Sequence, residues 1–264
     1  MNIVVCVKQT PDTAELPKIS VAEVTSGDIK TTLVLNPWDE FAVEEGLQLQ
    51  DRFGGDVTVV TVGEEKATEA LKDAIARGVQ SAVLLSDPAF AGSDAWGTAT
   101  ILAAAIKKNG PVDVVLAGKQ SVDGNSGLVA PGLARKLGAT LLTNVTKIVD
   151  VAGGKITVER QLEEGRETLT ASLPAVVSVS KEINDPRYPT FMGIRKASKA
   201  QIPVWSLADL DVSAGSVGQT AALAQWTDLR KPAARSSQVV LVKEATVEAT
   251  AAKLADLLMA EKVI

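Results

Sequence analysis

The chain has 264 residues, 46% of them apolar and only 3% aromatic, a composition that favours an α/β core of Val, Ile, Leu and Ala over an all-β sandwich. It contains no histidine and one cysteine, Cys6, which excludes histidine-dependent catalysis, an internal disulfide and a cysteine-based metal cluster. Carboxylates or a lysine could still serve in acid-base catalysis; we assign no catalytic residue and no metal ligand. The formal net charge is −5, from 27 basic and 32 acidic residues, and because no long basic run is present we expect no nucleic-acid partner.

Short β-branched runs alternate with helix-period segments in the first half of the chain. The runs at 3–7, 32–35, 56–62, 82–85 and 112–117 predict strands. Asn36-Pro37 provides an N-cap acceptor and a first-turn proline, Gly78 ends a second helix, and Ser93-Asp94 begins a third. This alternation predicts an open, mainly parallel sheet with helices on both faces, whose ligands lie beyond the carboxyl ends of the strands.

The pattern changes after about residue 141. Runs at 145–151, 155–160 and 167–171, with a Gly153-Gly154 turn, predict an antiparallel hairpin or meander, and 173–179 could return as another sheet strand. A final helix over 246–261 has one apolar side, which must be buried on its own domain or on another chain. We predict an α/β nucleotide-binding domain over 1–200, with the hairpin region at about 142–172, and a C-terminal arm and helix over 201–264.

The N-terminus and the apolar runs bear on location. The first residues lack the charged start, long apolar segment and cleavage site of a signal peptide, and the apolar runs are only strand-sized. We therefore expect a cytoplasmic protein with no membrane insertion.

A strand over 114–117 opens into a small-residue loop and then a helix, which suggests a phosphate site. Glycines at 118, 124 and 127 let the backbone approach a ligand, while Asn125, Ser126 and the first helical amides could surround a phosphate. The loop is neither a Walker loop nor a GxGxxG fingerprint, so a simple strand-to-helix turn is equally compatible. Segments 6–9, 36–39 and 61–63 should end at the same sheet edge, and this convergence favours a nucleotide crevice.

Residues 181–196 form a second candidate site. Two prolines and a glycine predict an irregular segment, yet it carries Tyr188, Phe191 and Met192, which a solvated loop does not normally display. The surrounding basic residues are Arg187, Arg195, Lys196 and Lys199. These features suggest a docking loop for another protein. The alternative is that Tyr188 and Phe191 cover their own domain.

With these segments in view, the sequence resembles the β subunit of electron transfer flavoproteins over nearly the whole chain. The matching motifs are Val7-Lys8-Gln9, Leu35-Asn36-Pro37-Trp38-Asp39, Ala42-Val43-Glu44-Glu45, Ala76-Arg77-Gly78, Gly118-Lys119-Gln120 with Asp123, Glu159-Arg160, Leu173-Pro174-Ala175-Val176-Val177 and Ile183-Asn184-Asp185-Pro186-Arg187-Tyr188. Their order and spacing together are specific, although no single motif is decisive.

The resemblance implies an adenine nucleotide α-hydrolase-like fold and a heterodimer. A partner α subunit would hold most of the redox FAD, and this chain would bind a structural AMP. The AMP contacts that it implies are Cys6, Asn36, Pro37, Trp38, Asp39, Val62, Gly118, Lys119, Gln120, Ser121, Val122, Asp123, Gly124, Asn125, Ser126, Gly127, Leu128 and Val129. The docking loop that it implies, at about 184–199, includes Pro186, Arg187, Tyr188, Phe191, Met192, Ile194, Arg195 and Lys196, with Phe191 as the apolar anchor.

The implied function is electron transfer from acyl-CoA and related flavin dehydrogenases to a downstream quinone oxidoreductase, with the C-terminal arm packed on the partner subunit. Two alternatives stay open. A subset of the family holds a second FAD in place of AMP and bifurcates electrons; Asp123-Gly124 and Pro131 resemble that subset, whereas the residues from Asn125 to Leu128 do not. A stand-alone adenine-nucleotide sensor of the universal-stress type could share the same core.

Overall fold

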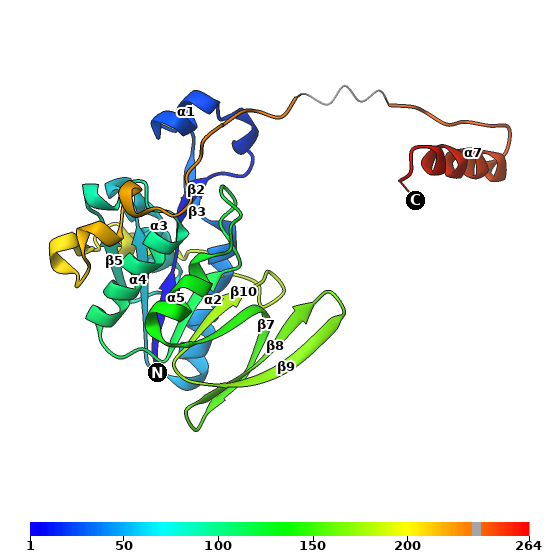
Figure 1. The fold of residues 1–264 in the computed structure, drawn as a ribbon. Helices are drawn as coiled ribbons and strands as arrows, with labels where there is room; N and C mark the ends of the chain where they lie inside the picture. Colours follow the sequence, from blue (N-terminus) through cyan, green and yellow to red (C-terminus); the bar gives the residue numbers. More distant parts are fainter. Residues whose placement is uncertain (234–238, 264) are drawn as a thin grey trace. The chain divides into compact units, whose positions relative to one another are not determined.

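The computed structural model describes residues 1–233 and 239–263 and divides into two compact units, Met1–Asp228 and Leu229–Ile264. The first unit is built on a nine-stranded sheet with the order β11-β5-β4-β1-β6-β10-β7-β8-β9 (Figure 1). The strands are β1 (Asn2–Cys6), β4 (Asp56–Val62), β5 (Ser81–Leu85), β6 (Val114–Gly118), β7 (Thr140–Ala152), β8 (Lys155–Leu162), β9 (Gly165–Ser172), β10 (Ala175–Val179) and β11 (Val204–Trp205).

The pairing within this sheet confirms the predicted mainly parallel arrangement. Every pair from β11 to β7 is parallel, whereas β7, β8 and β9 pair antiparallel. The predicted meander therefore extends the same sheet. It joins the parallel part through β10, the strand expected to return after residue 173.

Helices cover both faces of the sheet, as the alternating pattern predicts. Side chains of α2 (Pro37–Phe53) and α3 (Thr68–Arg77) share one apolar cluster with the sheet, and those of α4 (Ala95–Asn109) and α5 (Val129–Leu137) share another. Because successive side chains of a strand point to opposite faces, β1 contributes to both clusters. The other α-helices of the described residues are α1 (Val21–Ser26), α6 (Phe191–Ala197) and α7 (Val247–Ala260).

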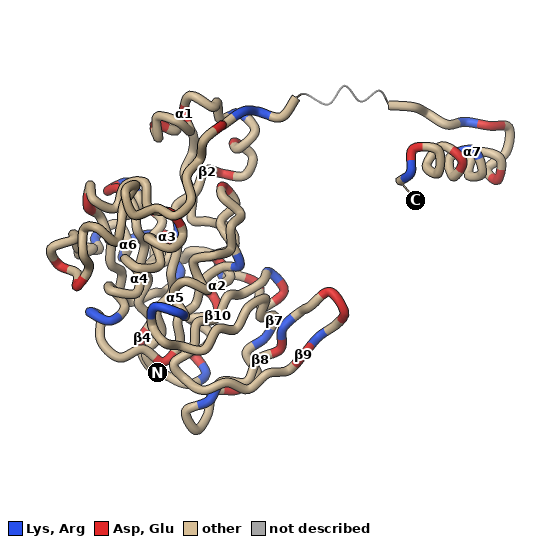
Figure 2. Tube along the Cα trace, in the orientation of Figure 1, with Lys and Arg blue, Asp and Glu red and all other residues tan. Residues whose placement is uncertain are grey.

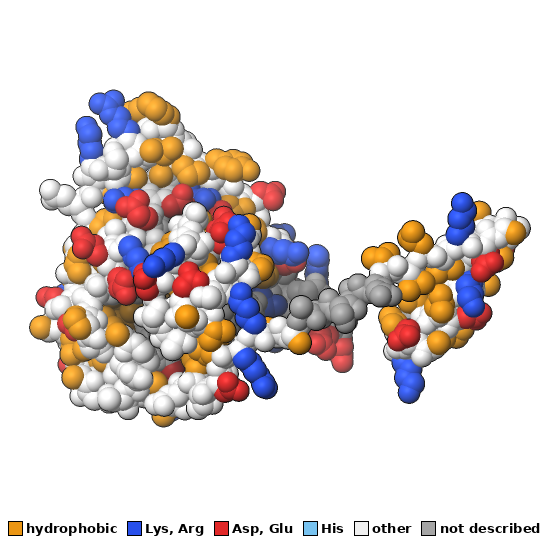
Figure 3. All heavy atoms as spheres, turned by 90° about the horizontal axis from the view of Figure 1, so that it is seen from above, with side chains coloured by type: hydrophobic (Ala, Val, Ile, Leu, Met, Phe, Trp, Pro, Cys, Tyr) orange, Lys and Arg blue, Asp and Glu red, His pale blue; other side chains and the backbone are white. Residues whose placement is uncertain are grey.

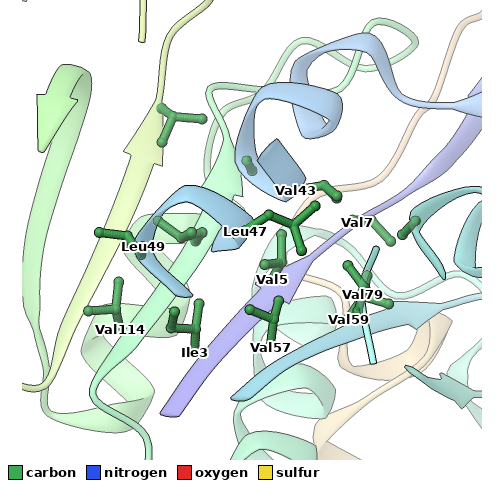
Figure 4. Close-up of a cluster of buried hydrophobic side chains, with 14 of the residues drawn as sticks. Ile3, Val5, Val7, Val43, Leu47, Leu49, Val57, Val59, Val79 and Val114 are labelled. Carbon is green, nitrogen blue, oxygen red and sulfur yellow. The ribbon is translucent and has the colours of Figure 1, made fainter. Parts of the chain in front are cut away.

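The contact between α2 and β1 shows how closely the layers pack (Figure 4). Val5 of β1 points toward Val43 and Leu47 of α2, and all three are at most 2% exposed. A Cβ atom added at Gly46 would lie 3.0 Å from Cγ2 of Val5. The helix therefore approaches the sheet at a distance that leaves no room for a larger side chain there.

The strand predicted at 32–35 forms, but it pairs with a different strand than expected. Residues 32–35 were expected in the parallel sheet, but β3 (Leu33–Leu35) pairs antiparallel with β2 (Gln9–Pro11) in a separate two-stranded sheet. The N–H of Asn36 also donates to the carbonyl of Lys8 at 2.9 Å. The backbone of this short run therefore forms its hydrogen bonds with the segment that directly follows β1, and not with the parallel sheet.

The C-terminal arm begins later than the predicted boundary at 201. β11 pairs with β5, and the N–H of Gly218 donates to Oγ of Ser93 at 2.8 Å, so residues 201–228 belong to the first unit. In the second unit α7 forms where a helix was predicted, and Oγ1 of Thr246 accepts the N–H of Ala249 at its start. Across the described ranges, none of the helices combines the length and apolarity needed to cross a membrane.

Candidate functional site

The order of the strands places a topological switch point between β1 and β6. From β1 the chain adds β4 and β5 on one side, whereas β6 lies on the other side. Ligands of open α/β sheets bind beyond the carboxyl ends of the strands at such a point. These ends lie at the top of Figure 1, opposite the N-terminus, and Figure 3 views the molecule from that side.

Asp39 joins the ends of β1 and β6 at this point. Its Oδ2 accepts the N–H of Lys8 at 2.8 Å, and its Oδ1 accepts the N–H of Gly118 at 3.1 Å. The carboxylate is buried, and burial raises its pKa to about 7 even though both backbone hydrogen bonds, and the charge of Lys8, favour the ionised form. Gly118 is required here because an added Cβ would lie 2.5 Å from Oδ1 of Asp39.

Asn36 holds the loop that follows β6. Its Nδ2 donates to the carbonyl of Gln120 at 2.9 Å, and its Oδ1 accepts the N–H of Val122 at 3.1 Å. Asn36 occupies the N-cap position of α2, but its side chain does not cap the helix, so the predicted capping role is wrong. Pro37 and Trp38 follow in the first turn and are partly buried.

Of the segments predicted to converge, 6–9, 36–39 and the loop after β6 are joined by the side chains of Asn36 and Asp39. The polar atoms of these two side chains hold the ends of β1 and β6 and the loop after β6 in place. Hydrogen bonds of this kind orient a binding site without themselves reaching a ligand.

The loop after β6 presents polar groups to solvent. Its exposed residues are Lys119, Asp123, Gly124, Asn125, Ser126 and Leu128, while Gln120, Ser121, Val122 and Gly127 are partly buried. Asn125 and Gly127 have φ angles of 50° and 62°, a left-handed backbone that brings the chain sharply into α5. The Nε2 of Gln120 donates to Oδ1 of Asn125 at 2.9 Å and closes the turn.

The start of α5 has the features of an anion site. The helix begins at Val129 with Leu128 at its N-cap position, and no side chain caps it. The first amides of an uncapped helix need acceptors and lie at the positive end of the helix dipole. A phosphate fits this position chemically.

Lys8 is a residue of this region that was not assigned to the site from the sequence. Its Nζ lies 2.9 Å and 2.7 Å from the two carboxylate oxygens of Asp123, so the ion pair spans the switch point from β1 to the loop after β6. A lysine directly after the first strand was the available signal. Its partner lies 115 positions away, a separation that local patterns cannot connect.

Cys6 and Val62 contribute apolar walls. Cys6 is 6% exposed and packs with Val4 and Ala117 in the core. Burial, reinforced by the charge of Asp39, raises the pKa of its thiol, so the group stays neutral near pH 7. Val62, the last residue of β4, is partly buried against the same cluster.

Two surface cavities, of about 490 Å³ and about 470 Å³, lie away from the switch point. The first is lined by α4, Lys136 and residues of the 209–216 segment, and the second by α2, β7 and β8. Strand topology and the uncapped start of α5 therefore favour a ligand at the switch point, whereas these two cavities do not mark it.

The candidate docking segment is more regular than predicted, because Phe191 begins helix α6. Oγ1 of Thr190 accepts the N–H of Gly193 at 2.9 Å and caps this short helix, a signal that the flanking prolines and glycine obscured. The exposed fractions are 89% for Tyr188, 81% for Phe191, 68% for Met192 and 54% for Ile194. These side chains therefore do not cover their own domain.

Arg187 does not lie on the basic rim of this segment. Its guanidinium donates to Glu44 and to Asp51, and Glu44 is a buried residue of α2. Pro186 is partly buried beside it. The exposed basic residues around the apolar side chains are Arg195, Lys196 and Lys199. Figure 2 shows basic and acidic residues interspersed along the chain.

Comparisons with known proteins identify the family. Residues 29–210 match the model of the electron transfer flavoprotein domain. The chain is 42% identical over 222 residues to the electron transfer flavoprotein subunit beta of Mycobacterium tuberculosis, which covers 82% of this chain and 83% of the relative. It is 42% identical over 212 residues to Protein FixA of Azotobacter vinelandii, covering 78% and 74%, and 38% identical over 221 residues to the subunit beta of Thermoanaerobacterium thermosaccharolyticum, covering 83% of each. The chain belongs to the electron transfer flavoprotein family.

Proposed function

We propose that this chain is the β subunit of a heterodimeric electron transfer flavoprotein. It would work with an α subunit to accept electrons from flavin dehydrogenases, such as acyl-CoA dehydrogenases, and pass them towards a quinone oxidoreductase. The observation that carries this proposal is the family match over most of the chain. FAD supplies the redox chemistry in such a complex, and the protein supplies binding and orientation. The absence of histidine from the sequence agrees with a subunit that performs no acid-base catalysis itself.

The crevice at the switch point is the proposed site of a structural AMP. Its phosphate would accept hydrogen bonds from the amides at the start of α5, and Lys8 would add a positive charge from the opposite wall. Asn36 and Asp39 would keep the two walls at a fixed separation. Because these contacts tie several strand ends to one ligand, we expect the nucleotide to stabilise the subunit.

Release of the bound nucleotides tests this assignment. The chain is coexpressed with its α subunit, the complex is purified, and the nucleotides are freed by denaturation and separated by chromatography. One AMP and one FAD per heterodimer is the expected result. Two FAD molecules would instead establish the bifurcating type, and a colourless homodimer with ATP would establish a sensor.

The exposed residues of α6 and its preceding loop are the proposed contact with the dehydrogenases. Phe191 offers an apolar anchor that a partner can bury, and a fully buried aromatic side chain contributes about 1.5–3 kcal/mol. The basic rim of Arg195, Lys196 and Lys199 suits an acidic surface, and such steering weakens as salt rises.

Phe191→Ala tests the docking assignment. We expect the KM for the dehydrogenase to rise by about tenfold or more, with nucleotide content and unfolding midpoint unchanged. Leu162→Ala, which truncates an exposed leucine at the end of β8, is the matched control. Equal transfer kinetics in both variants and the wild type would remove the assignment.

A further inference from the structure

An ion pair between Arg187 and the buried carboxylate of Glu44 helps to hold the 184–193 segment to the domain. We propose that Glu44 and Arg187 are positioning residues, whose ion pair fixes the backbone that presents Tyr188 and Phe191 to the dehydrogenase. This inference rests on the docking role proposed above. It assigns to α2 a part in partner recognition.

The guanidinium of Arg187 binds the carboxylate of Glu44 in a bidentate arrangement. Nε of Arg187 lies 2.8 Å from Oε2 of Glu44, and Nη2 lies 3.1 Å from Oε1. The backbone N–H of Arg187 also donates to Oε2 at 3.1 Å, so the carboxylate holds the main chain of the segment as well as its side chain. Bidentate, charge-assisted bonds of this kind restrict orientation more strongly than single hydrogen bonds do.

Glu44 stays ionised in this setting. Burial opposes the charge, but the hydrogen bonds from Arg187 and from Gln48 outweigh it and lower the pKa of Glu44 below its usual range. Its side chain is 6% exposed, against 38% for Arg187. Loss of Arg187 would leave the buried carboxylate of Glu44 without its charged partner, in a place that water reaches poorly.

Further bonds fix the segment on both sides of the exposed aromatics. Nδ2 of Asn184 donates to the carbonyl of Phe41 and to Oε2 of Glu45, both at 3.1 Å, so α2 also holds the chain before Arg187. Nη1 of Arg77 donates to the carbonyl of Arg187 at 3.1 Å.

Beyond the aromatic at 188, the N–H of Thr190 donates to the carbonyl of Ala76 at 3.3 Å. A side chain at Gly193 would clash with the same carbonyl, so the backbone of α6 packs directly against that of α3. The two helices are adjacent in Figure 2. The 184–193 segment is thus attached to α2 and α3 while Tyr188 and Phe191 stay exposed. A loop that is already ordered loses less conformational entropy when it binds, and its affinity is higher for the same contacts.

The second carboxylate of the cluster supplies a control. Asp51 lies 3.1 Å from Nη2 of Arg187, but its side chain is 62% exposed, so its contribution is screened by water. Asp51→Asn and Glu44→Gln are the same chemical change on two partners of one guanidinium. They differ in burial and in the contact with the backbone N–H of Arg187.

The experiment compares these variants in the purified heterodimer, using the flavin dehydrogenase that reduces the wild-type complex fastest. We expect Glu44→Gln to raise the KM for the dehydrogenase by about tenfold, with kcat, the flavin spectrum and the rate of reduction by dithionite unchanged. Asp51→Asn should change the KM by less than about twofold. Arg187→Lys keeps the positive charge but removes the planar guanidinium that binds Glu44 through two nitrogens, so it should also raise the KM. It provides a second variant if Glu44→Gln folds poorly.

A double-mutant cycle separates positioning from general destabilisation. Phe191→Ala should raise the KM less in the Glu44→Gln background than in the wild type. Phe191 contributes less to binding when Glu44 no longer holds the backbone that presents it. If Phe191→Ala alone leaves the KM unchanged, the docking proposal fails. If Phe191→Ala raises the KM while Glu44→Gln and Arg187→Lys do not, or if the effects in the cycle simply add, the positioning inference is overturned and the docking proposal stands.

Discussion

Removal of the Asp39 carboxylate should destabilise the subunit more than the loss of any exposed charge. In Asp39→Ala the amides of Lys8 and Gly118 both lose their acceptor, at sites where the wild-type bonds are 2.8 Å and 3.1 Å long. An unsatisfied buried amide costs about 1–3 kcal/mol; the bond to Gly118 is buried and the bond to Lys8 is partly buried, so the expected loss lies between about 1 and 6 kcal/mol. A whole domain is stable by only about 5–15 kcal/mol, so this loss is a large fraction of the total.

The pH dependence gives a second signature of the same group. The pKa of Asp39 is raised in the folded chain to about 7, whereas that of an unfolded aspartate is 3.8. The folded state therefore binds more protons between these two values, and the contribution of Asp39 to stability falls as the pH rises from about 4 to about 7. Asp39→Asn removes this titration and should flatten that part of the profile.

Denaturant unfolding of the purified heterodimer at pH 5.5 and at pH 8.5 measures both effects. Asp123→Asn, which neutralises a more exposed carboxylate of the same region, is the control and should change the free energy of unfolding by less than about 1 kcal/mol. If Asp39→Ala is as stable as the wild type, or if the profile keeps its slope in Asp39→Asn, the assigned role of this carboxylate is wrong.

Three further predictions concern the crevice and the core. Lys8→Met should weaken the binding of AMP by about tenfold, measured by calorimetry on nucleotide-free complex, because the proposed charged contact to the phosphate would be lost; equal affinity would contradict it. Gly46→Val should lower the free energy of unfolding by about 1–3 kcal/mol, since an added Cβ meets Cγ2 of Val5 at 3.0 Å; an unchanged denaturation midpoint would count against this packing. The thiol of Cys6, whose pKa is raised by burial, should react with a thiol reagent only on unfolding, and rapid labelling of the folded complex would contradict its placement.

Local signals in the sequence predicted most of the elements. The start of α2 at Pro37 and the end of α3 before Gly78 follow from residues at the helix ends, and the Gly153-Gly154 turn gave the β7–β8 hairpin. Short β-branched runs gave the strands. Nothing in a three-residue strand states its partner, however, and β3 was placed in the wrong sheet for that reason.

The candidate site was also predicted only in part from the sequence. The sequence correctly predicted that segments 6–9 and 36–39 meet the loop after β6 at one edge of the sheet, because parallel strands place their carboxyl ends together. It could not show that Asn36 bonds to the 120–122 loop instead of capping α2, or that Arg187 points inward to Glu44. Both contacts join residues more than 80 positions apart, and they depend on tertiary packing.

The most direct test of the account is a count of the adenylate bound when the turn before α5 is distorted. Gly127 and Gly153 have similar left-handed φ angles, 62° and 57°, but Gly127 lies in the proposed phosphate turn and Gly153 in the β7–β8 turn. A valine is disfavoured by φ at both positions, and at Gly127 its Cβ would also lie 3.3 Å from the carbonyl of Lys119. We expect the purified Gly127→Val heterodimer to lose its AMP while keeping FAD, and the Gly153→Val heterodimer to retain one AMP. Equal AMP content in the two variants would contradict a nucleotide site at this turn.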